Sequence, residues 1–240
     1  MKHRFSAAAF LLFAVLALAS RSDASTIVNP PVGTSPGDTY RFIFVTDLTT
    51  AQSTDIATYN GVVNANVAAS PDLTGLGTTW TALASTALVD VFTNTGLNPL
   101  DTTTKFYNVL GELIATGVTT AGTGLYGGVS TAHGAAILTG SGAAYANVVL
   151  TGTGLDGATQ VPATSFAMGG RAELTTFAWT AQAMFPCCSS IPLYGISAEF
   201  SFPGGGSEVP EPGTIGLTAL GGAFLFLGRR RKKQKGQACV

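Results

Sequence analysis

Basic residues, histidine and cysteine are scarce in this chain. Only 10% of its 240 residues are charged, and it contains two histidines and three cysteines. Between Thr26 and Ser207 the only basic residues are Arg41, Lys105 and Arg171, against ten acidic ones. A body with this balance has no basic patch that could neutralise phosphates, so we do not expect nucleic acid as a partner.

The scarcity of histidine limits the catalytic chemistry. His133 is the only histidine left once the N-terminal signal described below is removed, so a Ser-His-Asp triad would have to use it. Its surroundings, "TAHGAA", lack the spacing of a nucleophile elbow, and we interpret it as a loop histidine. We therefore predict no catalytic residue, no cofactor and no metal ligand, and we expect that the protein is not an enzyme.

The cysteines leave three alternatives open. Cys187 and Cys188 are adjacent in "PCCSS", and Cys239 lies in the C-terminal tail. In an exported protein the adjacent pair could close a vicinal disulfide, bond to another chain, or remain as thiols. A metal role would need more ligands nearby than the sequence offers.

The N-terminus predicts export. The basic start "MKHR" is followed by an apolar run over 5–19 and by small residues at the −3 and −1 positions of a cleavage after Ala24. This layout is typical of a secretory signal peptide. The alternative, an N-terminal membrane anchor, is disfavoured because the run is short for a hydrocarbon core of ~30 Å. We expect a signal helix over 1–24 and a mature N-terminal lead over 25–38.

The C-terminus carries a second apolar run, 213–228, which has no charged residue. As a helix these 16 residues would span about 24 Å, which is short but insertable when the flanks help. A Gly-rich spacer over 203–209 and two prolines precede it, and the prolines stop the helix from extending backwards. A basic cluster that the positive-inside rule keeps in the cytoplasm follows: Arg229, Arg230, Arg231, Lys232 and Lys233.

At these residues the chain resembles a known class. "VPEPGTIGLTALGGAFLFLGRRRKK" is similar to the PEP-CTERM sorting signal of exopolysaccharide-producing bacteria. The resemblance implies a sorting signal over 210–235 and processing by a membrane-embedded exosortase near Pro210, Glu211 and Pro212. It also implies an inner-membrane intermediate, then delivery to the cell surface or extracellular matrix. The alternative is a permanently anchored protein with one transmembrane helix.

The body over 39–202 is expected to be one compact α+β domain with a single main helix early in the chain. Residues 53–69 predict this helix, with a cap from Ser53 or Thr54 and with Pro71 after its end. Apolar residues at helical spacing form one face: Ile56, Tyr59, Val63 and Val67.

The rest of the body is rich in short strand patterns, which we expect to pair in antiparallel fashion. The candidates are "TYRFIFVT" (39–46), "TTWTALAS" (78–85), "KFYNVLGELIAT" (105–116, two strands about a turn at Gly111), "AYANVVLTGT" (144–153) and "PLYGISAEFSF" (192–202).

These motifs, taken in order, resemble a secreted bacterial domain that often accompanies PEP-CTERM signals. The resemblance implies a C-type-lectin-like or endostatin-like fold. Two departures stand out: Leu150 and Gly195 occupy positions where such domains more often have Trp and Cys. The second departure puts the usual closing disulfide of the fold in doubt. The calcium-site tripeptides of C-type lectins, Glu-Pro-Asn and Gln-Pro-Asp, are absent, so no calcium or sugar ligand follows from the resemblance.

Two glycine-rich stretches are interpreted as loops. "GTGLYG" at 122–127 formally matches GxGxxG, but no helical periodicity follows it and the next acid is Asp156. "GTGLDGAT" at 152–159 places Asp156 and Gly157 at the corner of a turn.

The sequence therefore predicts an exported, exosortase-processed protein with a non-enzymatic binding or structural role. Its expected partners are the exosortase, the membrane through 213–228, and extracellular polysaccharide or surface proteins. The alternative is a secreted hydrolase that acts on matrix polysaccharide, which would need two carboxylates converging in a cleft.

Overall fold

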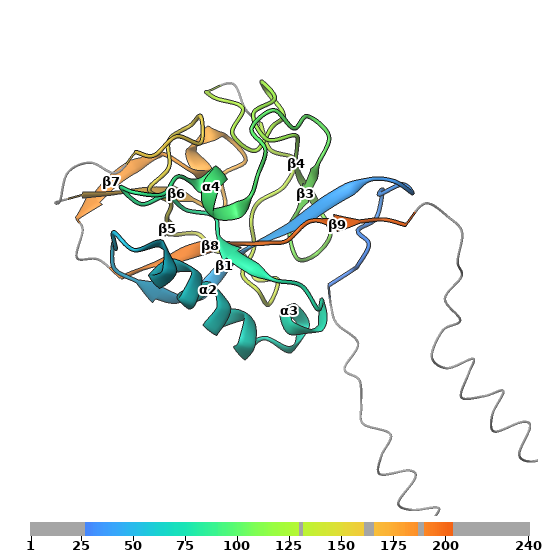
Figure 1. Ribbon diagram of the computed structural model, residues 1–240, viewed down its shortest axis with the longest axis horizontal. Coiled ribbons are helices and arrows are strands. Elements are labelled where there is room, and N and C mark those ends of the chain that lie inside the picture. Colours follow the sequence, from blue (N-terminus) through green and yellow to red (C-terminus); the bar gives the residue numbers. More distant parts are fainter. Residues whose placement is uncertain (1–26, 130–131, 161–165, 187–189, 204–240) are drawn as a thin grey trace, which may run out of the picture. The chain divides into compact units, whose positions relative to one another are not determined.

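The computed structural model describes residues 27–203 except 130–131, 161–165 and 187–189 (Figure 1). The described residues up to Phe202 belong to one compact unit, and a second unit starts at Pro203. The predicted signal helix and the predicted C-terminal span lie outside the described residues. No helix in the described ranges has the length and apolar character that crossing a bilayer requires.

The body is rich in strands and has few helices. In chain order its elements are β1 (Thr39–Thr50), α2 (Ile56–Ala69), α3 (Pro71–Gly75), β2 (Trp80–Ala82), α4 (Val91–Thr95), β3 (Lys105–Tyr107), β4 (Leu113–Thr116), β5 (Val148–Leu150), β6 (Phe166–Arg171), the 3₁₀ turn η1 (Phe177–Trp179), β7 (Ala183–Pro186), β8 (Ile191–Ser197) and β9 (Phe200–Ser201).

The strands form one mixed sheet in the order β4-β3-β1-β8-β5-β6-β7, with β2 on β8 and β9 on β1. The expectation of antiparallel pairing is wrong in two places, because β1 pairs with β3 and β5 pairs with β8 in parallel. Parallel neighbours need a long crossover. Between β1 and β3 the chain supplies one, since it passes through α2, α3, β2 and α4.

Strand β1 is buried on both faces. Phe42 and Phe44 belong to a hydrophobic cluster shared with α2, while Ile43 and Val45 belong to a second cluster built around Trp179. The alternation seen in "TYRFIFVT" is therefore real, but each face meets a core of its own. In Figure 1, α2 and α3 lie along one side of the β1–β8 pair.

Helix α2 is the longest helix of the described residues and presents the predicted face. Tyr59 and Val63 are fully buried in the first cluster, and Ile56 and Val67 pack against it. The predicted cap is wrong by one or two residues. Asp55 is the N-cap, in extended conformation, and its Oδ1 accepts the N–H of Ala57 at 2.9 Å.

Most predicted strands are confirmed, including the pair about Gly111, which has a φ of 79°. Helices α3 and α4 and strands β6 and β7 were not predicted. Helices of five residues carry too few turns for a periodic signal. The sequence of β6, "FAMGGR", contains two glycines, which is unusual for a strand interior. The lectin-like and endostatin-like resemblance remains a prediction.

Gly195 has a packing role in this fold. It faces Phe44 across the β1–β8 pair, and a Cβ built on it would lie 2.7 Å from Phe44 Cζ and 3.0 Å from Val63 Cγ1. The Phe44 ring therefore occupies the space that a cysteine would need here. We expect Gly195→Ala to lower the free energy of unfolding by about 1–3 kcal/mol through overpacking, as measured by urea denaturation.

Gly61 provides the matched control. It lies exposed in the middle of α2, and a Cβ built there meets no atom within 4 Å. Gly61→Ala should raise the free energy of unfolding by about 0.5–1 kcal/mol, because alanine loses less backbone entropy in a helix. Equal destabilisation by both substitutions would contradict the packing role assigned to Gly195.

Candidate functional site

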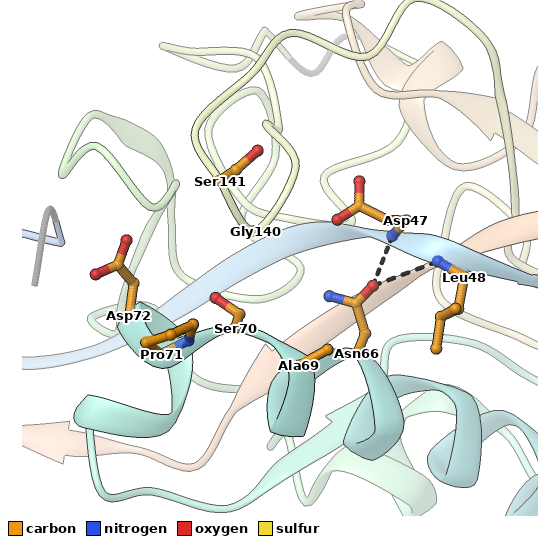
Figure 2. Close-up of a pocket in the computed structure, with 9 residues that line it drawn as sticks. All are labelled: Asp47, Leu48, Asn66, Ala69, Ser70, Pro71, Asp72, Gly140 and Ser141. Atoms are coloured by element: carbon orange, nitrogen blue, oxygen red, sulfur yellow. Dashed lines mark hydrogen bonds between the residues drawn. The ribbon is translucent and has the colours of Figure 1, made fainter.

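A hollow of about 320 Å³ lies where the far end of β1, the end of α2 and a loop around residue 140 come together (Figure 2). Three separate stretches of chain build it. Its described lining residues are Asp47, Leu48, Asn66, Ala69, Ser70, Pro71, Asp72, Gly140 and Ser141.

The hollow begins at an irregularity in the sheet. The register between β1 and β8 shifts between Val45 and Thr49. Asn66 of α2 replaces the missing ladder partner, since its Oδ1 accepts the N–H groups of Asp47 at 2.7 Å and Leu48 at 3.3 Å. Thr46 supplies two further hydrogen bonds at this irregularity. Its Oγ1 donates to the Leu48 carbonyl at 2.6 Å and accepts the N–H of Leu193 at 2.9 Å. Backbone groups that the sheet leaves unpaired at this irregularity are thus satisfied by side chains.

Ser70 marks the corner between α2 and α3. It is the C-cap of the first helix and the N-cap of the second, and its Oγ accepts the N–H of Leu73 at 3.4 Å. Pro71 fits the first position of α3, where no N–H is needed. The helix direction therefore changes here, and Ser70 and Asp72 are left on the rim of the hollow.

The third wall is a tight loop. The Thr139 N–H donates to the Ala143 carbonyl at 2.8 Å, and Thr139 Oγ1 lies 3.0 Å from Ser141 Oγ. Gly140 lies on the floor, where a Cβ would come within 2.9 Å of Leu73 Cδ1 and 3.6 Å of Asn66 Nδ2. A side chain at position 140 would therefore take up part of the floor.

The hollow is acidic. Asp47 and Asp72 both line it, and none of its nine described lining residues is basic. The sequence analysis counted these two acids among the ten of the body. It did not predict that they lie together, since they belong to different elements. One signal was available: Asn66 follows Val63 by three residues, so a helix places it on the buried face, where an amide needs partners.

His133 lies in a loop, as predicted, but it is also buried, with 6% of its surface exposed. Its ring centroid is 5.3 Å from that of Trp179. Burial lowers the pKa of His133 to about 4, although interactions with the backbone of Leu125 and Gly124 act in the opposite direction. Its Nε2 has no hydrogen-bond partner among the described residues.

Comparison with known protein families decides the nature of the C-terminus. Residues 208–232 match the PEP-CTERM protein-sorting motif. The chain carries a PEP-CTERM sorting signal. The resemblance read from "PEP", the apolar run and the basic cluster is thereby confirmed, and the motif implies a protein targeted to an exosortase and exported toward the cell surface. No curated protein matches the chain.

Several predicted features of this PEP-CTERM protein lie outside the described residues. They include Pro210, Glu211 and Pro212, the basic cluster at 229–233, and the cysteine pair Cys187 and Cys188. Their predicted roles in processing, membrane retention and disulfide formation therefore remain predictions.

The three basic residues of the body are all engaged within it. Lys105 Nζ lies 2.6 Å from Asp38 Oδ2, and Arg171 Nη2 lies 2.5 Å from Glu173 Oε1. Arg41 is buried, and its Nη1 donates to the carbonyl of Thr95 at 3.1 Å. No described group of three or more His, Cys, Asp or Glu residues could hold a metal ion.

The two glycine-rich stretches are loops, as predicted. Residues 122–127 form turns, with the Gly124 N–H donating to the Thr120 carbonyl at 2.7 Å. In the second stretch Gly157 has a φ of 81°, and Asp156 Oδ1 accepts the N–H of Ala158 at 3.0 Å. Asp156 thus takes part in turn chemistry.

Proposed function

We propose that the chain is an exosortase-processed protein of the cell surface or exopolysaccharide matrix that acts by binding or as structure, without catalysis. The match of residues 208–232 to the sorting motif carries this proposal. It is supported by the signal-peptide pattern at 1–24 and by a body in which only one histidine, His133, is available, buried beside Trp179.

In this account the C-terminus is a processing signal. From the sequence, we expect Pro210 and Pro212 to keep the peptide around Glu211 extended, in a form that an enzyme in the membrane can bind. The apolar run up to Gly228 halts translocation, and the basic cluster after it keeps the tail in the cytoplasm.

Glu211→Ala tests the processing step. We expect this substitution to leave full-length protein in the inner membrane, while the body folds normally, because the change removes the residue between the two prolines. Cell fractions should be blotted with one antibody against the body and another against the tail. The unsubstituted protein should reach the surface and react only with the body antibody.

A tail that stays attached to unsubstituted protein at the surface would contradict processing. Permanent anchoring through 213–228 would then be the better account. Glu199→Ala is the matched control, since it removes the same charge at an exposed position outside the matched residues 208–232 and should be processed normally.

One observation favours the alternative, a hydrolase of matrix polysaccharide. Asp47 and Asp72 line one hollow, and glycosidases use two carboxylates on either side of the scissile bond. A hydrolase cleaves the polysaccharide, whereas a binding or structural protein leaves it intact. Reducing ends released from matrix polysaccharide by the unsubstituted protein, and lost in both Asp47→Asn and Asp72→Asn, would establish the hydrolase.

A further inference from the structure

The hollow contains a fixed hydrogen-bond donor, the Asn66 side-chain N–H, that no described residue of the body accepts. Asn66 is 4% exposed, and its Oδ1 is occupied by the N–H groups of Asp47 and Leu48. Because an amide oxygen must face those two donors, the orientation of the side chain is determined and Nδ2 points into the hollow (Figure 2). Nδ2 makes no hydrogen bond to any residue that the structure describes, so it is available to an oxygen of a ligand.

The acceptors of the hollow lie around this donor. The carboxylates of Asp47 and Asp72 accept hydrogen bonds, and the hydroxyl groups of Ser70 and Ser141 can both donate and accept. A ligand must therefore accept from Asn66 and donate to the two carboxylates. A hydroxyl group does both, and several neighbouring hydroxyls on one small ring meet all of these groups together.

Charge and size narrow the ligand further. The Asp47 carboxylate, with no basic residue among the described lining residues, disfavours acidic ligands such as uronic acids and phosphorylated or sulfated sugars. A volume of about 320 Å³ stands at the lower end of the range for small-molecule sites, which suits one ring. Leu48 and Pro71, on opposite sides of the hollow in Figure 2, offer apolar surface to the C–H groups of such a ring.

We propose that this hollow binds a single non-acidic sugar unit, either free or presented by a polysaccharide. Asn66 donates to a ring or hydroxyl oxygen, and Asp47 and Asp72 accept from hydroxyl groups. The hydroxyl groups of Ser70 and Ser141 make the remaining hydrogen bonds to the sugar. The inference deepens the binding role proposed above and rests on it.

The test is isothermal titration of the full chain, purified in a zwitterionic detergent that contains no sugar. Three sets of trisaccharides serve as probes: neutral hexoses, glucosamine and uronic acids. We expect the neutral and the glucosamine sets to bind at least tenfold more tightly than the uronic acids. A preference for glucosamine over neutral sugars would indicate that its ammonium group pairs with a carboxylate.

Substitutions test whether the sugar binds in the hollow. Asp47→Ala removes a carboxylate but keeps the backbone N–H that anchors Asn66, and we expect at least a tenfold loss of affinity. Glu199→Ala removes the same charge at an exposed position outside the lining and should bind as the unsubstituted protein does. Ser141→Phe should block the hollow from an exposed loop position, with the melting temperature as the check on folding.

Three outcomes would overturn the inference: equal binding of uronic acids, equal affinity in the Asp47→Ala and Glu199→Ala variants, or binding that only Ca²⁺ produces and that EDTA abolishes. None of them affects the proposed processing, because Glu211→Ala is read by fractionation. Normal processing with no sugar binding would remove this inference alone.

Discussion

Val63→Asp is expected to unfold the exported body. Val63 is fully buried on α2 and packs in the same cluster as Phe42 and Phe44. The three basic residues of the body are engaged with other groups, so a carboxylate there would have no cationic partner among the described residues. Burying an unpaired polar or charged group costs several kcal/mol, against a total stability of typically about 5–15 kcal/mol.

The measurement is far-UV circular dichroism during thermal and urea unfolding. Ala65→Asp is the control, because residue 65 is exposed in the same helix and receives the same charge. Its expected cost is below about 1 kcal/mol, which reflects helix propensity alone. If both variants melted at the temperature of the unsubstituted protein, α2 would not be packed on the sheet as described.

Acidification between pH 6.5 and pH 4 is expected to destabilise the body through His133. The folded state holds its pKa at about 4, against 6.5 for a free histidine, because burial disfavours the charged ring. The unfolded chain therefore binds the proton first as the pH falls. The contribution of neutral His133 is fully present above pH 6.5 and is lost by about pH 4. The gap between the two pKa values corresponds to roughly 3 kcal/mol.

Urea midpoints measured at intervals from pH 7.5 to pH 4 should show this loss. His133→Phe keeps an aromatic ring beside Trp179 but cannot titrate, so its midpoints should stay nearly flat over the same window. The titration of Asp38 falls outside this pH window. The hydrogen bond from Lys105 lowers the pKa of Asp38 below 3.8, and its contribution is lost only at more acidic pH. Parallel losses in both proteins would refute the assignment to His133.

The sequence was most informative where one periodicity ran over many residues. β1 and α2 have 12 and 14 residues, long enough for alternation and helical spacing to be read. Strands β3 and β4 were found because the turn at Gly111 lies between two short apolar runs. The mixed pairing could not be read, because which strands become neighbours depends on contacts between distant segments rather than on local pattern.

The hollow escaped prediction for a related reason. Its polar groups come from the shifted end of β1, the last turn of α2 and the loop after Thr139, and each of these stretches is unremarkable alone. The burial of His133 was missed in the same way. Its partner Trp179 is 46 positions further along the chain and stands in a 3₁₀ turn.

The direction of β1 determines what the body presents to its surroundings. Its first residues pair with β9, and the chain leaves the body just after β9, at Phe202 (Figure 1). Asp47 lies seven residues beyond Tyr40, the partner of Phe200, which corresponds to about 23 Å along a strand. Within the body, the Asp47 wall of the hollow therefore lies well separated along β1 from the residues at which the chain leaves the body.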